Sequence, residues 1–210
     1  MGSFLKRSQV IPCAAVLLSV ILPADMPAAV DGPNLAVNPD FESLGPGGIP
    51  SAWSTWQRVD GATFRVIADA KIAHSGKTCV AIKQTATNSR NYAVWVQTIP
   101  SKANAIYRYS FWIKTEDVRP VTPYTADGPM VAGDVGFLDA NRKNLAFEGP
   151  ALRSSNVLMT HDWTRFEISA RAPAQTAFIK INLNLANAVG TVYFDSVSLV
   201  ESSFKKLESP

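Results

Sequence analysis

The sequence predicts an all-β protein in which two antiparallel sheets pack face to face or close into a small barrel. Eight short segments are rich in β-branched and aromatic residues, and Gly, Pro, Asn and Asp separate them. No window of a dozen residues repeats its apolar positions near the helical period. The expected strands cover residues 62–69, 78–85, 92–99, 106–115, 134–140, 164–171, 177–186 and 191–200. Segments 116–133 and 147–162 lack strand character and are expected to be long loops.

The first 29 residues have the pattern of a secretory signal peptide. Lys6 and Arg7 precede VIPCAAVLLSVILP, an apolar run of 14 residues, and small residues follow up to Ala29. A membrane-spanning helix needs about 20 apolar residues, so this run is too short. We therefore expect cleavage after Ala29 and a secreted protein, extracellular or periplasmic, without stable membrane association. An uncleaved membrane anchor is the alternative.

Residues 30–203 are then expected to form one domain, and residues 204–210 a disordered tail. The whole chain has 210 residues, of which 47% are hydrophobic and 18% charged, which suits one globular domain. Its net charge is +3 and no block of Lys and Arg stands out, so nucleic acid is not expected as a partner.

Catalytic and redox motifs are missing from the sequence. It contains no G-x-S-x-G, H-E-x-x-H or C-x-x-C motif and no phosphate-binding loop. Cys79 is the single cysteine after the signal, so no disulfide can form within the mature chain, and Cys79 is interpreted as a structural strand residue. We therefore expect a protein that is not an enzyme.

Side-chain alternation assigns one face of three strands to the core. In residues 177–186 every odd-numbered position from 179 is Ile or Leu, and in 106–115 the odd-numbered positions from 107 to 113 are aromatic or Ile. In 92–99 the face of Tyr92, Val94 and Val96 is assigned to the core. Six residues are thereby expected on faces opposite the core: Trp95, Gln97, Trp112, Lys114, Asn182 and Asn184.

Five stretches occur in a suggestive order along the chain. They are NLAVNPDFESLGPGGIPSAW (34–53), HSGKTCVAIK (74–83), YRYSFWIKT (107–115), HDWTRFE (161–167) and GTVYFDSVSLVE (190–201). Together they resemble the secreted carbohydrate-binding modules grouped around families 4, 9, 16 and 22. This resemblance implies a galactose-binding-like β-jelly roll, a sandwich of two antiparallel sheets.

The resemblance also implies a concave sheet that holds a polysaccharide or oligosaccharide, with action beside secreted glycoside hydrolases. Aromatic rings stack on sugar faces while amides and charged groups bond hydroxyls, because sugar C–H groups meet the negative face of a ring. The six residues named above are the expected binding residues. The alternative for Trp95 and Trp112 is that the long loops cover them as a second core.

A structural calcium ion is commonly implied by the same resemblance. The matching carboxylates are Glu42 and Asp195, with backbone carbonyls expected near Lys77 and Asn38. Hard oxygen ligands from several loops suit calcium. The alternative is that both carboxylates bond backbone amides and hold no metal.

The sequence thus predicts a secreted, non-catalytic carbohydrate-binding module. One alternative is a polysaccharide lyase or glycoside hydrolase on the same jelly roll, for which Asp134, Asp139 and Glu148 are the carboxylates expected near the cleft. The other alternative is a structural or adhesion module without a glycan ligand.

Overall fold

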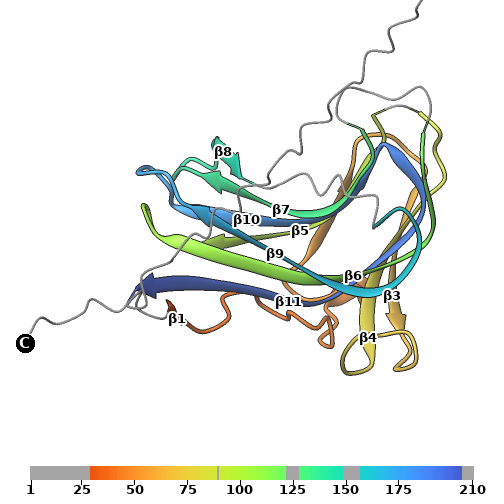
Figure 1. Cartoon of the computed structure of the whole chain (residues 1–210), viewed down its shortest axis with the longest axis horizontal. Helices are drawn as coiled ribbons and strands as arrows, with labels where there is room; N and C mark the ends of the chain where they lie inside the picture. The colour runs from red at the N-terminus through yellow and green to blue at the C-terminus, as the bar shows by residue number, and fades with distance from the viewer. Residues whose placement is uncertain (1–28, 89, 122–127, 149–156, 205–210) are drawn as a thin grey trace, which may run out of the picture.

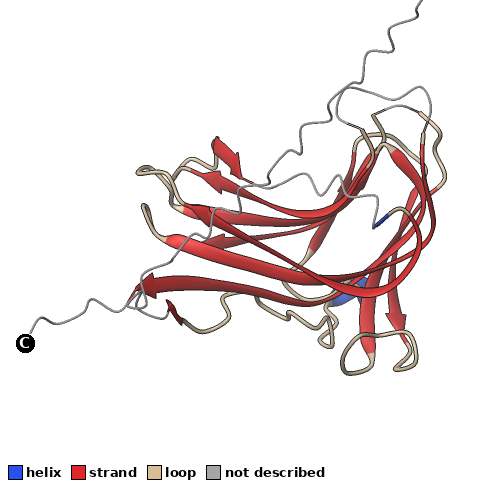
Figure 2. Cartoon of the chain, viewed as in Figure 1, coloured by secondary structure: helices blue, strands red, loops and turns tan. Residues whose placement is uncertain are grey.

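The computed structural model describes residues 29–204 except residues 89, 122–127 and 149–156. Within these residues the chain forms two antiparallel sheets joined by loops and short turns, one of which is the 3-10 turn at Pro46–Gly48 (Figures 1 and 2). In the residues that the structure describes, no helix is long and apolar enough to span a membrane. The predicted all-β sandwich is confirmed.

The two sheets differ in size and strand order. The six-stranded sheet has the order β3-β4-β11-β6-β9, with β1 paired to β11. Its strands are β1 (Ala29–Asp31), β3 (Ala62–Ala68), β4 (Thr78–Gln84), β6 (Ile106–Pro120), β9 (Met159–Arg171) and β11 (Ala188–Phe204). The five-stranded sheet has the order β2-β5-β10-β7-β8. Its strands are β2 (Ser54–Gln57), β5 (Tyr92–Pro100), β7 (Met130–Leu138), β8 (Asn144–Glu148) and β10 (Phe178–Ala186).

All eight expected strands are present, and three further strands were not expected. These are β1, β2 and β8, which have three, four and five residues. The segments expected as loops are shorter than predicted, because β6 runs on to Pro120 and β9 already begins at Met159. The pairing of β6 with β9 shifts register around Thr115. A bulge of this kind breaks the strict alternation on which a sequence-based assignment depends.

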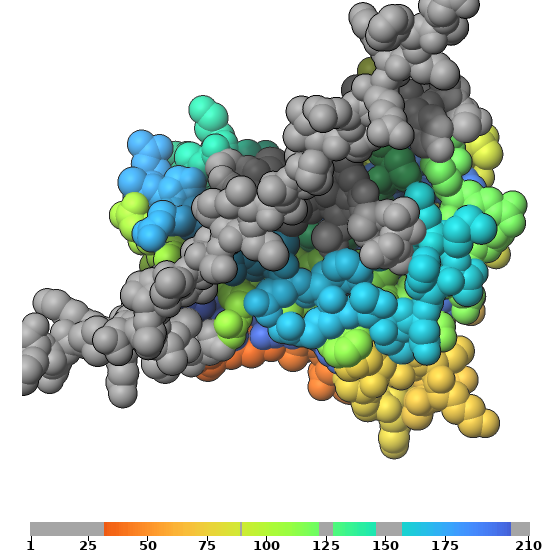
Figure 3. Space-filling model, viewed as in Figure 1, coloured from red at the N-terminus to blue at the C-terminus, as the bar shows by residue number. Residues whose placement is uncertain are grey.

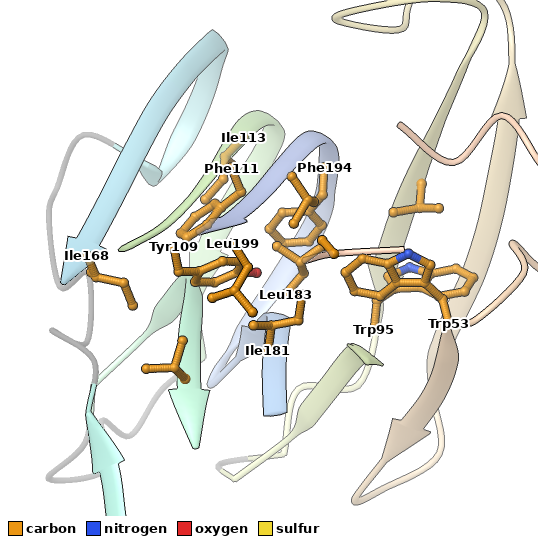
Figure 4. Close-up of a cluster of buried hydrophobic side chains, with 14 of the residues drawn as sticks. Trp53, Trp95, Tyr109, Phe111, Ile113, Ile168, Ile181, Leu183, Phe194 and Leu199 are labelled. Atoms are coloured by element: carbon orange, nitrogen blue, oxygen red, sulfur yellow. The ribbon is translucent and has the colours of Figure 1, made fainter. Parts of the chain in front are cut away.

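The core lies between the two sheets and confirms the face assignments of β10 and β6 (Figure 4). Ile181 and Leu183 on β10 are fully buried, as are Tyr109 and Phe111 on β6. Gly133 on β7 makes room for Phe111, since a Cβ at this position would lie 2.2 Å from the ring. The close approach of the two sheets therefore depends on a residue without a side chain.

The face assignment of β5 is wrong. Trp95 pairs directly with Leu183, and residues paired across antiparallel strands project to the same face. Trp95 is therefore a core residue: 1% of its surface is exposed, its ring meets Phe64 edge-on at 5.6 Å, and its Nε1 donates to the Ala81 carbonyl (3.3 Å). The core face of β5 carries Ala93 and Gln97, so it looks less apolar in sequence than the face with Tyr92 and two valines.

Gln97 is buried as well, and its amide holds the N-terminal segment. Its Oε1 accepts a hydrogen bond from the Val37 N–H and its Nε2 donates to the Val37 carbonyl, both at 2.8 Å. Asn34, in the same segment, makes similar bonds. Its Nδ2 donates to the Val197 carbonyl, and its Oδ1 accepts from the Leu199 N–H. Gln97 therefore satisfies backbone groups and belongs to the fold.

Candidate functional site

A groove of about 640 Å³ lies on the outer face of the five-stranded sheet, opposite the core. We call it the sheet groove, and its lining residues are Trp56, Arg58, Tyr92, Val94, Val96, Met130, Asp134, Asn144, Lys180 and Asn182. Strand register explains this set. Trp56 pairs with Val94, and Asn182 pairs with Val96 on one side and Asp134 on the other. The groove therefore runs across β2, β5, β10 and β7, and paired residues on neighbouring strands line it side by side.

Aromatic side chains form one edge of the sheet groove. Trp56 on β2 is 52% exposed, and its ring lies 5.8 Å from that of Tyr92 at an angle of 54°. The Arg58 guanidinium lies 5.8 Å from the centre of the Tyr92 ring. Burial and the nearby charge of Asp134 raise the pKa of Tyr92, so its hydroxyl stays protonated. This edge offers an exposed ring supported from behind by a second ring.

The floor of the sheet groove is polar. Asp134 accepts hydrogen bonds from the Nδ2 atoms of Asn182 (2.5 Å) and Asn184 (2.7 Å). Burial raises the pKa of Asp134, although the two amides and the charge of Lys180 act in the opposite direction. Asn182 and Asn184 thus lie on the face that the sequence predicted for them, and a carboxylate that was not among the expected binding residues links them.

Trp112 and Lys114 lie elsewhere, on the other sheet of the sandwich. The Trp112 ring stacks on His74 with 3.8 Å between centres and 22° between planes, and Trp163 meets His74 at 5.7 Å. Burial lowers the pKa of His74. Lys114 Nζ lies 3.5 Å from the Asp162 carboxylate. The six residues expected to form one binding surface are therefore divided among the groove, the core and the opposite sheet, and that part of the prediction is wrong.

Trp56 was not among the expected binding residues, because the sequence left open whether it lines the rim of a site; it lies on β2, a strand of four residues. A signal for it was present in PSAWSTW, residues 50–56. Trp53 and Trp56 are three positions apart, and an odd spacing in extended chain places two side chains on opposite faces. Trp53 is buried and packs on Phe41 at 5.1 Å, which leaves Trp56 facing outward.

The carboxylates predicted to bind calcium hold one loop between β3 and β4, which protrudes at the lower edge of the molecule in Figure 3. Glu42 Oε1 accepts from the N–H groups of Lys77 (2.5 Å) and Thr78 (2.8 Å). Asp195 Oδ2 accepts from those of His74 and Ser75, both at 2.9 Å. The Lys77 N–H lowers the pKa of Glu42, whereas burial raises that of Asp195 to about 6.

This arrangement does not fit a calcium ion between the two carboxylates, because the loop turns N–H groups toward them. The Asn38 carbonyl is also occupied, accepting from Trp53 Nε1 (3.2 Å) and from the Phe41 N–H (3.2 Å). Among the described residues no group of three or more His, Cys, Asp or Glu side chains could hold a metal. Bonding to backbone amides, the alternative left open by the sequence, describes Glu42 and Asp195, and calcium stays a prediction.

Asp139, the second carboxylate expected near a cleft, does not join Asp134. Asp139 closes a turn, with its Oδ1 accepting from the N–H groups of Asn141 (2.8 Å) and Lys143 (2.9 Å). The side chain of Glu148 lies outside the described part of the structure. Glycoside hydrolysis commonly uses two carboxylates flanking the bond, and Asp134 is the carboxylate that the described side chains place in the groove.

The chain matches no protein-family model and no curated protein sequence. Its fold matches solved structures at low sequence identity. A family 4 carbohydrate-binding module is 19% identical with a TM-score of 0.50, and the match covers 80% of this chain and 99% of the module. The Stig cyclase Fisc from Fischerella sp. TAU is 17% identical with a TM-score of 0.53, and the match covers 85% of this chain and all of the cyclase.

The enzymatically active domain of tailspike protein 4 of bacteriophage CBA120 is 16% identical with a TM-score of 0.55. The match covers 79% of this chain and 21% of the tailspike chain, so this chain spans about a fifth of that protein. At such low identities, the structural likeness shows the fold alone. It is the jelly roll of carbohydrate-binding modules, as the resemblance implied, and enzymes also share it.

Proposed function

We propose that this protein binds a polysaccharide or oligosaccharide in the sheet groove. The observation that carries this proposal is the exposed Trp56 ring beside a floor of amide, carboxylate and ammonium groups. A sugar ring needs both kinds of group, because its C–H face is apolar and its hydroxyls require directional partners. An exposed aromatic side chain next to convergent polar groups is typical of a binding site.

The proposed role is that of a secreted, non-catalytic module acting beside separately secreted glycoside hydrolases. Support comes from the signal-like first 29 residues and from the shared fold of the family 4 module. A single carboxylate among the described groove side chains also favours binding over two-carboxylate hydrolysis.

Affinity electrophoresis of the purified protein through gels containing a panel of soluble polysaccharides tests the proposal. We expect retention by at least one glycan, and the loss of at least about tenfold in affinity for Trp56→Ala, since an exposed aromatic anchor carries much of such an interface. Trp112→Ala is the matched control, because that ring lies on the other sheet, and it should bind like the wild type. Equal retention of Trp56→Ala and wild type would contradict the proposal.

A jelly-roll enzyme is the second candidate, and the raised pKa of Asp134 favours it. A carboxyl group that stays protonated at higher pH can donate a proton to a leaving group. The same incubations, assayed for new reducing ends and for the absorbance of new double bonds, distinguish the candidates. Product that appears with the wild type and disappears with Asp134→Asn would support the enzyme.

A further inference from the structure

The orientation of two amides in the sheet groove follows from Asp134. An ionised carboxylate only accepts hydrogen bonds, whereas an amide has one donating and one accepting end. The Nδ2 of Asn182 donates to Oδ1 of Asp134 (2.5 Å) and the Nδ2 of Asn184 donates to its Oδ2 (2.7 Å), so both carboxylate oxygens act as acceptors. The carbonyl oxygens of the two amides consequently point away from the carboxylate.

Within the described residues, neither of these two oxygens accepts any of the hydrogen bonds that were found. Asn184 is fully buried, and no described group donates to its Oδ1. Asn182 lines the sheet groove, and none of the hydrogen bonds found among the described residues ends on its Oδ1. The cost of about 1–3 kcal/mol for a buried amide oxygen without a partner applies to Asn184. Asn182 is the amide that lines the groove, so its oxygen is the one to which a bound ligand could donate.

The network is held from the core as well as from the groove. The backbone carbonyl of Asn182 accepts from the buried Tyr109 hydroxyl (3.1 Å), and strand pairing places Asn182 between Val96 and Asp134. Asn184 reaches the same carboxylate diagonally, one pair further along β10. The position of Asn182 is thereby fixed by strand pairing, and its amide can differ only in which end faces the groove.

We propose that Asp134 is a positioning residue that fixes the Asn182 amide with its oxygen toward the groove, so that the site selects a glycan with a ring hydroxyl donating to this oxygen. This inference rests on the proposed glycan binding and specifies its ligand chemistry. A hydroxyl can donate, whereas a ligand group that only accepts, such as a carboxylate or a fluorine, cannot satisfy Asn182.

The consequence is a measurable preference among analogues of one ligand. The probes are xylohexaose, cellohexaose and β-1,4-galactohexaose, followed by derivatives of the tightest binder in which one hydroxyl position at a time carries fluorine. Fluorine is small and cannot donate a hydrogen bond. We expect one substituted position to lower the wild-type affinity about tenfold in calorimetry, the loss that corresponds to one hydrogen bond.

Asp134→Asn should remove this preference. An asparagine at position 134 has one accepting and one donating end and can itself turn over, so the Asn182 amide is no longer held and can present either its oxygen or its NH₂ group to the groove. We expect discrimination between the hydroxyl and fluorine probes to fall below about threefold. Asn182→Ala removes the accepting oxygen itself and should lose the preference too, which keeps the test valid if Asp134→Asn does not fold.

The matched control is Asp162→Asn, the same chemical change at an exposed site on the other sheet, and it should keep the tenfold preference. A folded Asp134→Asn that retains the preference would overturn the proposal, whatever its overall affinity. Wild-type binding with no sensitive position would overturn it as well. If wild type binds none of the probes or panel glycans, the proposed function fails instead.

Discussion

Two tryptophans of the five-stranded sheet have opposite roles in this protein. Trp95 lies on a nine-residue strand and is buried, whereas Trp56 lies on a four-residue edge strand and is half exposed. Hydrophobic alternation alone assigned Trp95 to the wrong face. Its pairing with Leu183, a long-range contact, decides the matter.

Trp95→Ala is predicted to destabilise the fold by about 3–5 kcal/mol, because it removes a fully buried indole from the core. Chemical denaturation measures this loss, with Trp56→Ala as the control expected to cost less than about 1 kcal/mol. Wild-type stability combined with lost glycan retention in Trp95→Ala would return Trp95 to the binding site.

Part of the site could be predicted from single residues and part could not. The unbroken Ile and Leu face of β10 was enough to place Asn182 and Asn184 on the sheet face opposite the core, where both meet Asp134. Asp134 could be given its role only from the pairing of β7 with β10, which brings its carboxylate beside both amides. Side-chain partners across strands depend on register, and the sequence of one strand does not contain it.

At the scale of elements, the loop between β3 and β4 depends on two carboxylates from distant parts of the chain. Glu42 holds the N–H groups of Lys77 and Thr78, and Asp195 holds those of His74 and Ser75. The loop in turn supplies the His74 ring that stacks on Trp112. Removing either carboxylate should therefore loosen both the loop and the aromatic cluster behind it.

Glu42→Gln is predicted to lower stability by about 1 kcal/mol at neutral pH, since an uncharged acceptor replaces a charged one at the surface. The pKa of Glu42 lies below its ordinary 4.5, mainly because of the Lys77 N–H. A lowered carboxyl pKa stabilises the fold above the unfolded value and loses that effect as the pH falls through the folded value. The difference between wild type and variant should shrink below pH 4.5.

Denaturation at several pH values measures this difference. A gap between wild type and Glu42→Gln that stays constant down to pH 3 would show that the charge of Glu42 is not what matters.

Calcium removal separates the two interpretations of the same loop. The calcium prediction expects a chelator to lower the melting temperature and added calcium to restore it. The alternative, in which the carboxylates of Glu42 and Asp195 bond only the loop, expects no change, and the N–H groups on one oxygen of each carboxylate support it. A fall in melting temperature that calcium reverses would contradict this and favour the ion.

For the whole molecule, strand content and the sandwich were predictable, because eight segments alternate or carry strand-forming residues between clear turns. The strand order was not predictable. In the five-stranded sheet β10 lies between β5 and β7, although other strands separate β10 from both of them along the chain. The division of the predicted binding residues between two sheets follows from this order. A surface that looks continuous along the chain can be split by the crossovers of a jelly roll.

Cleavage of the first 29 residues remains a prediction at this scale. It would leave Val30 as the first residue and remove Ala29, the first residue of β1. Val30 and Asp31 would keep their pairing with Ser203 and Ser202. Mass spectrometry of the exported protein measures the cleavage site, and an intact leader in the membrane fraction would instead indicate an uncleaved anchor.

The pairing of β1 with the end of β11 has a mechanical consequence. Ala29 lies opposite Phe204, and the two strands run antiparallel. Tension applied at Ala29 and Phe204 would separate β1 from β11 starting at this end, so that their hydrogen bonds break one after another. Resistance to force would then have to come from inner strand pairs such as β6 with β11, and the outer ladder would open first while the groove of the other sheet stays intact.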